Sequence, residues 1–169
     1  SHSKNQPENS TFSAAASYAH DYWPCGGWVG EEDEEWVARA AYKTFYGIVR
    51  LRVLSDATLQ IDLSVDPAGS QGPFQAGFTL RLRHPIVSGL SGKSLVLDAT
   101  PFQATAQELG GGFRHGSVSV KGPEDFRVYW PFSPYNAYAA DHKSGLDASL
   151  LRVGVELTPT RRRASFILN

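Results

Sequence analysis

The sequence has a single cysteine, no methionine and almost no net charge. Cys25 has no second cysteine to pair with, so no disulfide forms within the 169 residues. The formal net charge of −1 lacks the positive excess that nucleic acids and anionic membrane surfaces attract. No apolar run is long enough to cross a bilayer as a helix. With 41% hydrophobic and 20% charged residues, the composition predicts a globular protein whose partners are neither nucleic acids nor membranes.

Signatures of catalysis by a nucleophile or a metal are also missing. The chain lacks the Gly-x-Ser-x-Gly elbow, and Cys25 has no histidine close by in the sequence to activate its thiol. The histidines lack the two-residue spacing that lets two imidazoles on one strand bind the same metal ion. We therefore predict no metal site and no cofactor. The histidines are His2, His20, His84, His115 and His142.

The first 20 residues differ in composition from the rest of the chain. Residues 1–20 are rich in Ser, Asn, Gln and Ala and predict a flexible arm ahead of a single β-domain over residues 21–169. Asn9-Ser10-Thr11 is an N-glycosylation sequon within this arm. Because the chain begins Ser1-His2-Ser3 and has no methionine, we expect that it lacks its natural start. The lone cysteine is compatible with an intracellular protein or with a secreted one. The sequon and the trimmed start favour a secreted protein with Asn9 as a candidate glycosylation site.

Residues 31–41 predict the one helix of the chain. Five acidic residues, 31–35, would occupy its first turn, where the helix dipole favours negative charge. Trp36, Val37 and Ala40 would then face the core. Because five consecutive carboxylates do not converge on one point, we interpret the acidic run as a solvated helix start rather than as a metal site.

From residue 42 onwards, apolar and polar residues alternate with a period of two, as in half-buried β-strands. This alternation favours antiparallel pairing with one solvated face. Short strands separated by Gly and Pro turns predict an all-β fold, either an antiparallel β-sandwich or a closed β-barrel of about nine strands. The expected strands are residues 47–54, 58–65, 78–83, 94–98, 102–107, 117–121, 126–130, 151–157 and 164–168.

Aromatic residues gather in two irregular segments. One precedes the predicted helix, and the other follows the predicted strand 126–130 after Pro131. If both segments close over one end of the sheet, they line an apolar pocket for a hydrophobic small molecule. The alternative is a second hydrophobic cluster under the loops, or tryptophans that plug an open end of the sheet. The candidate substrate-binding residues are Trp23, Trp28, Trp130, Phe132, Tyr135 and Tyr138.

Arginines occupy the polar side of several predicted strands. One explanation is a solvated face on which Arg50 or Arg52 pairs across a hairpin with Asp62. The other is that one or two arginines enter a pocket and bind an oxygen-rich ligand, since guanidinium groups bind carboxylates and enolates bidentately. Arg127 and Tyr129 share the polar side of strand 126–130 and are the candidate catalytic residues, because both donate hydrogen bonds to a carbonyl oxygen.

These features favour a cofactor-free enzyme that orients hydrophobic substrates for cyclisation, isomerisation or cycloaddition. Orientation alone lowers a barrier by about 7–11 kcal/mol in favourable cases. In its size, the Asn9 sequon, the all-β pattern, the lone Cys25 and the Trp/Tyr-rich loops around Trp23 and Trp130, the chain resembles the small secreted fungal proteins that catalyse hetero-Diels–Alder coupling in tropolonic sesquiterpenoid pathways. The resemblance implies a tropolone quinone methide and a humulene-type alkene as substrates.

Two other functions remain open. A non-catalytic carbohydrate- or small-ligand-binding β-sandwich would stack exposed Trp and Tyr rings on sugar faces. The aromatic residues here cluster with prolines in loops instead of following one strand face, which favours the enzyme. The third possibility is an interaction protein that uses the arginine-bearing face.

Overall fold

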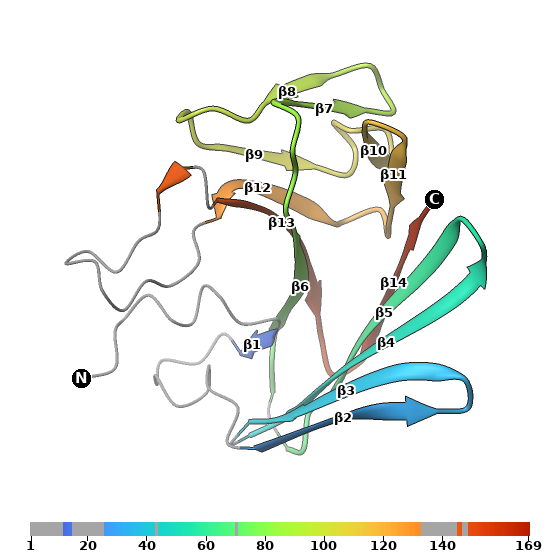
Figure 1. Cartoon of the computed structure of the whole chain (residues 1–169). Coiled ribbons are helices and arrows are strands. Elements are labelled where there is room, and N and C mark those ends of the chain that lie inside the picture. Colours follow the sequence, from blue (N-terminus) through green and yellow to red (C-terminus); the bar gives the residue numbers. More distant parts are fainter. Residues whose placement is uncertain (1–11, 15–25, 43, 70, 133–144, 147–148) are drawn as a thin grey trace.

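The computed structural model shows an all-β chain, as the alternation predicted. Its described residues form two antiparallel sheets and no α-helix, and each sheet is open, with an edge strand at either end (Figure 1). Each of the nine predicted strands overlaps a strand of the structure. The described residues are 12–14, 26–42, 44–69, 71–132, 145–146 and 149–169.

The smaller sheet has five strands in the order β1-β6-β13-β12-β9. Its centre is β13, which pairs over seven register positions with β6, while β12 lies between β13 and β9. At one edge, β1 lies within the predicted arm and pairs with β6. The bounds are β1 Phe12–Ala14, β6 Phe74–Leu80, β9 Phe102–Thr105, β12 Arg127–Phe132 and β13 Leu150–Leu157.

The larger sheet has nine strands in the order β2-β3-β4-β5-β14-β11-β10-β7-β8. Figure 1 shows β2 to β5 as one broad ribbon at the bottom right and β7 and β8 at the top. The bounds are β2 Gly26–Glu32, β3 Glu35–Ala41, β4 Tyr46–Ser55, β5 Thr58–Asp66, β7 Ile86–Gly89, β8 Ser94–Val96, β10 Gly112–His115, β11 Val118–Lys121 and β14 Arg163–Leu168.

The helix predicted for residues 31–41 is wrong, because this segment is the β2–β3 hairpin. Its two turn residues, Asp33 and Glu34, have positive φ angles of 50° and 65°, as a tight two-residue hairpin turn requires. Consecutive side chains of β3 therefore point to opposite faces. Trp36, which we expected in the core, is 59% exposed. Val37 is 1% exposed, but it shares the outer face of β3 with Glu35 and is in register with Arg50.

The acidic run is stabilised by arginines of neighbouring strands rather than by a helix dipole. Glu32 accepts hydrogen bonds from Arg39 and Arg50, and the buried carboxylate of Glu35 accepts hydrogen bonds from Arg50 and Arg52. These contacts join β2, β3 and β4 across the outer face of the larger sheet. They offset the repulsion that Glu32 and Glu35 would otherwise experience as register partners.

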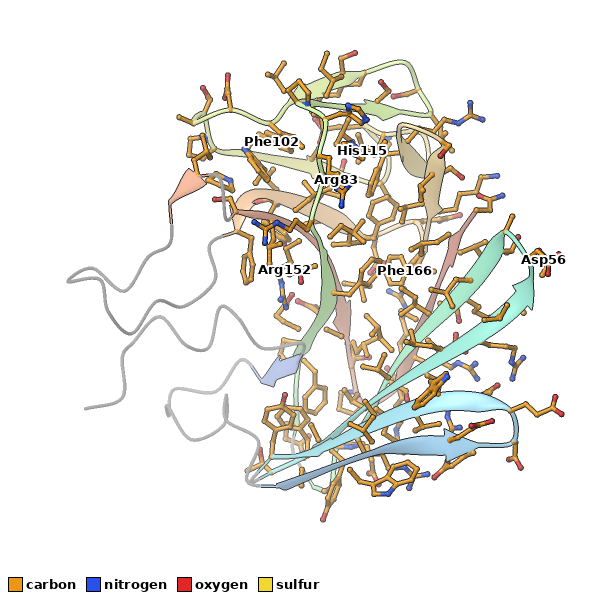
Figure 2. All side chains as sticks on the ribbon, in the orientation of Figure 1. Asp56, Arg83, Phe102, His115, Arg152 and Phe166 are labelled. Atoms are coloured by element: carbon orange, nitrogen blue, oxygen red, sulfur yellow. The ribbon has the colours of Figure 1, made fainter. Side chains whose placement is uncertain are left out.

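One hydrophobic core joins the two sheets. Phe166 of β14 is fully buried, and its ring lies 5.1 Å from that of Phe78 on β6 and 6.1 Å from that of Phe126 (Figure 2). The core takes alternate residues from each strand, such as Leu63 and Val65 on β5 and Val153 and Val155 on β13. The intervening residues of both sheets therefore point away from the core, in opposite directions.

Candidate functional site

The outer surface of the five-stranded sheet carries the two predicted catalytic residues. On β12, Val128 and Trp130 are buried in the core, so Arg127 and Tyr129 project from the opposite face, as their alternation predicted. In register, Arg127 lies opposite Gly154 of β13, and Tyr129 lies opposite Arg152. Four side-chain positions on two adjacent strands thus form one surface.

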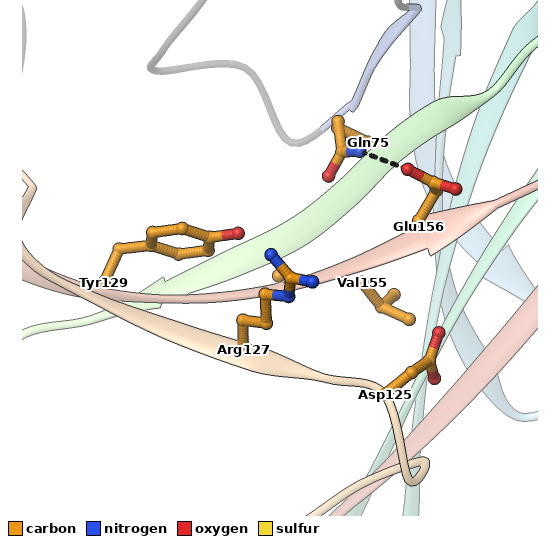
Figure 3. A pocket seen from close by; sticks show the side chains of 7 residues that line it. Gln75, Asp125, Arg127, Tyr129, Val155 and Glu156 are labelled. Atoms are coloured by element: carbon orange, nitrogen blue, oxygen red, sulfur yellow. Dashed lines mark hydrogen bonds between the residues drawn. The ribbon is translucent and has the colours of Figure 1, made fainter. Parts of the chain in front are cut away.

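This surface is hollowed where glycine replaces a side chain. A cavity of about 210 Å³ opens beside β12 and β13 (Figure 3), and Gly154 is one of the residues that line it. Figure 3 shows the Arg127 guanidinium reaching between Tyr129 and Glu156. The lining residues are Gln75, Asp125, Arg127, Tyr129, Gly154, Val155 and Glu156.

The two carboxylates at the rim already have partners. Asp125 accepts hydrogen bonds from both terminal nitrogens of Arg161, at 2.5 and 2.8 Å, and these bonds hold the pKa of Asp125 below its usual value despite partial burial. Glu156 accepts a 3.1 Å hydrogen bond from the amide of Gln75. Arg127 makes no hydrogen bond or ion pair to any described residue. The hollow therefore presents a guanidinium group and a phenol whose donor capacity is available to a ligand.

Two further residues extend the surface beyond the hollow. The Arg152 guanidinium carbon lies 5.1 Å from the ring centroid of Phe132, a cation–π contact. Burial lowers the pKa of Arg152, an effect that Tyr129 and Tyr42 partly oppose. Phe132 follows an irregularity in the β12–β13 register after Tyr129, and this contact places it on the same face as Arg152. Of the six predicted substrate-binding aromatics, Phe132 is the one that the described structure places against Arg152, the register partner of Tyr129, although it is not among the residues that line the hollow.

Trp130 lies on the other face of β12. It is 7% exposed, and its indole Nε1 donates a 2.7 Å hydrogen bond to the carbonyl oxygen of Asp98. Its ring lines a separate hollow together with Leu82, Leu97 and Leu146. Trp130 and Tyr129 are thus in different cavities, because neighbouring residues of a strand point to opposite sides.

Trp28 lies on the outer face of β2, an edge strand of the larger sheet, whereas β12 belongs to the five-stranded sheet. Its ring lies 5.8 Å from the Arg39 guanidinium and packs over Gly30, where an added Cβ would meet the indole at 2.3 Å. The structure therefore does not join Trp28 to the hollow at Arg127. The remaining predicted site residues, Trp23, Tyr135, Tyr138 and Asn9, fall outside the described residues.

The expected pairing of Arg50 or Arg52 with Asp62 is replaced by other partners. Arg50 is in register with Asp62, but its ion pairs are with Glu32 and Glu35. Asp62 instead pairs with Arg163 of β14.

The sequence interpretation missed Gly154 and the rim of the hollow. Gly154 interrupts the apolar–polar alternation of β13, and an isolated glycine inside a strand pattern is a signal of a bulge or of a close approach. Gln75 and Glu156 are ordinary polar strand residues in the sequence. Only their register across β6 and β13 brings them together at the rim.

Comparisons with known proteins find no matching family model and no curated relative of this chain. Within the described residues, no cluster of three or more His, Cys, Asp and Glu side chains is arranged to hold a metal ion. In the same part of the chain, no helix has the length and apolar character needed to span a membrane.

Proposed function

We propose that the chain is a cofactor-free enzyme that orients hydrophobic small molecules on the outer face of its five-stranded sheet for cyclisation or cycloaddition. The observation that carries the proposal is the projection of Arg127 and Tyr129 into one glycine-lined hollow. The Arg127 guanidinium has no hydrogen-bond partner among the described residues. Both groups are therefore available to bind a substrate oxygen.

The chemistry that these groups supply is hydrogen bonding to an oxygen that gains negative charge in the transition state. Arg127 and the Tyr129 hydroxyl donate to a carbonyl or enolate oxygen, and such donors act most strongly where water is excluded. The rings of Tyr129 and Phe132 offer apolar surface to the rest of the substrate. No proton transfer or covalent intermediate is needed, so orientation and polarisation account for the rate enhancement.

The volume of the hollow limits what it holds. At about 210 Å³, it is smaller than the ~300 Å³ at which pockets for drug-sized ligands begin. It therefore suits the oxygen-bearing ring of a substrate, while the hydrocarbon part extends toward Phe132. An intermolecular hetero-Diels–Alder reaction in secondary-metabolite biosynthesis, as the family resemblance implies, fits this division.

The test is the rate of coupling between a quinone methide generated in situ and a humulene-type alkene. We expect Arg127→Gln and Tyr129→Phe each to lower the protein-dependent rate by about tenfold or more, because each removes a hydrogen bond to the developing charge. Matched controls are Arg114→Gln and Tyr46→Phe, which change exposed residues on the larger sheet. Equal rates for the four variants would reject the assignment of Arg127 and Tyr129.

A non-catalytic small-ligand- or carbohydrate-binding protein is the second candidate. The rim of the hollow at Arg127 favours this binding function, because the side chains of Gln75, Glu156 and Asp125 carry amide and carboxylate groups that bind sugar hydroxyls. Thermal-shift measurements against terpenoids and soluble glycans separate the two. A glycan that stabilises the protein and loses this effect in Gln75→Ala, in a protein without coupling activity, would favour the binding function.

Secretion and glycosylation at Asn9 belong to the same proposal, supported by the sequon. Expression in a secretory host with and without Asn9→Gln tests them. A mass difference of one glycan between the two proteins is the expected outcome.

A further inference from the structure

The hollow beside Trp130 is separate from the proposed active site. It measures about 370 Å³, is lined by both apolar and basic residues, and lies on the face of β12 opposite to Arg127. A volume of this size is within the range of pockets for small organic ligands. Nothing in the proposed reaction uses it.

The floor of this hollow is apolar and fixed in orientation. Trp130 donates its indole N–H to the carbonyl oxygen of Asp98, so the polar edge of the ring is satisfied inside the protein. Trp130 is 7% exposed, so only a small part of its indole contributes apolar surface to the hollow, which Leu97 also lines. Leu146, a further lining residue, is 44% exposed. This combination leaves a patch of apolar surface in contact with solvent.

The wall of the hollow, residues 82–85, is held in place by His115. The imidazole Nε2 of His115 accepts hydrogen bonds from the backbone N–H groups of Arg83 and His84, at 3.2 and 3.3 Å. Because Nε2 faces two donors, the proton is on Nδ1, which donates to the carbonyl oxygen of Ile86 at 3.2 Å. Figure 2 shows His115 beside Arg83. The wall is therefore organised before any ligand arrives.

The side chain of Arg83 gives this wall its charge. It is exposed, lines the hollow, and makes no ion pair or side-chain hydrogen bond within the described part of the chain. A guanidinium at the rim of an apolar hollow matches a ligand with an apolar body and one carboxylate. A neutral hydrocarbon would offer the Arg83 guanidinium no hydrogen-bond acceptor.

We propose that the Trp130 hollow is a second binding site, for an amphipathic monocarboxylate. The hydrocarbon body packs on Trp130, Leu97 and Leu146, and the carboxylate accepts hydrogen bonds from Arg83. The site is independent of the proposed catalysis, since it uses none of the residues at Arg127.

Calorimetric titration with decanoate and decanol, both below the concentrations at which they aggregate, tests the proposal. The two probes share a hydrocarbon chain and differ in charge. We expect decanoate to bind at least tenfold more tightly than decanol, and Arg83→Gln to remove this difference while leaving decanol binding unchanged. Leu146→Ser should weaken both probes several-fold, because it removes exposed apolar surface without disturbing the core.

Two controls make the outcome decisive. Arg114→Gln, a charge-matched change elsewhere on the surface, should leave the preference for decanoate intact. Arg127→Gln should also leave it intact, so a failure of the proposed catalytic site is separable from a failure here. The proposal is overturned if wild-type protein binds both probes equally or neither probe, or if Arg83→Gln keeps the preference for decanoate.

Discussion

Gly77 of β6 and Gly154 of β13 are register partners, so two adjacent positions on the outer surface of the five-stranded sheet have no side chain. The two glycines tolerate substitution very differently. A Cβ on Gly154 would lie 3.3 Å from Cε2 of Tyr129, a flexible side chain. A Cβ on Gly77 would lie 2.4 Å from the backbone oxygen of Val153, which cannot move without disturbing β13. The hollow at Arg127 therefore depends on Gly154, and the sheet itself depends on Gly77.

The first prediction compares Gly154→Ala with Gly77→Ala. Gly154→Ala should lower the coupling rate or ligand affinity about tenfold, because the new methyl group enters the hollow and displaces the Tyr129 ring. Its free energy of unfolding should change by no more than about 1 kcal/mol. Gly77→Ala should lose about 1–3 kcal/mol of stability through overpacking. Urea denaturation measures the stability of the two variants, and the coupling assay measures their activity. Full activity in Gly154→Ala would show that the hollow is not the substrate site.

Sequence periodicity was sufficient for much of the fold but not for the first hairpin. The alternation in β4 and β5 is regular, and the structure pairs the two strands as predicted. The segment Trp36-Val-Ala-Arg-Ala-Ala41 carries no such clear alternation, and its alanines favour a helix locally. What decides its structure is pairing with β4, including hydrogen bonds from Arg50 and Arg52 to Glu35. These contacts span 15 and 17 residues, so no local pattern contains them.

The same alternation of side chains along a strand also predicted part of the site. Our sequence interpretation did not apply it to every residue of strand 126–130. The alternation placed Arg127 and Tyr129 on one face of β12, where the structure has them. It also implies that Trp130 points the other way, so one pocket containing both Tyr129 and Trp130 was inconsistent with the strand pattern. The position of Trp28 required the strand order of the larger sheet, which pattern alone does not determine.

The second prediction concerns the β2–β3 turn. Glu34 has a φ of 65°, a backbone conformation that costs a residue with a side chain about 1–2 kcal/mol and costs glycine little. Replacing Glu34 with glycine removes this cost, which stabilises the folded state. The greater conformational freedom of glycine in the unfolded chain offsets part of that stabilisation. Glu34→Gly should therefore stabilise the protein by about 0.5–1 kcal/mol, measured by urea denaturation.

The sign of this change separates a hairpin from a helix. In a helix, glycine at residue 34 would destabilise by about 1 kcal/mol relative to alanine. Glu31→Gly is the matched control, because Glu31 lies inside β2, where glycine should cost about 0.5–1 kcal/mol. A loss of stability in Glu34→Gly would contradict the turn.

The third prediction concerns Asp62, a carboxylate that is 3% exposed on the outer face of the larger sheet. Burial alone raises its pKa, but hydrogen bonds from Ser165, Arg163 and Gln60 together bring the pKa below its usual value. Asp62→Asn removes the charge and turns an N–H group toward one of these donors. We expect a loss of about 1–3 kcal/mol, measured by urea denaturation at pH 7.

Arg163→Gln provides the comparison for Asp62. The Arg163 side chain is 57% exposed, so its removal should cost less than about 1 kcal/mol, because water replaces much of the exposed ion pair. The two other donors to Asp62 remain in this variant. Equal losses for the two variants would mean that the ion pair alone, and not the full set of hydrogen bonds, stabilises the buried carboxylate.

The last prediction uses the pH dependence of Glu108. Its side chain accepts a 2.6 Å hydrogen bond from Lys93 and bonds of 2.8 and 3.1 Å from the backbone N–H and hydroxyl of Thr105, which lower its pKa to about 2.

Because the folded pKa lies below the unfolded value of 4.5, the ionised carboxylate stabilises the fold fully above pH 4.5. This contribution decreases as the pH falls from 4.5 and is lost near pH 2. Because the pair is exposed and solvent screens it, Glu108→Gln should lower the Tm at pH 7 by only about 1–3 °C, and the difference from wild type should shrink steadily below pH 4.5. Glu124→Gln, a change at an exposed carboxylate without a hydrogen-bond partner among the described residues, should have little effect on the Tm at pH 7. Circular dichroism melts at pH 7, 4 and 2.5 measure this, and a difference in Tm that stays constant over that range would contradict the assigned hydrogen bonds.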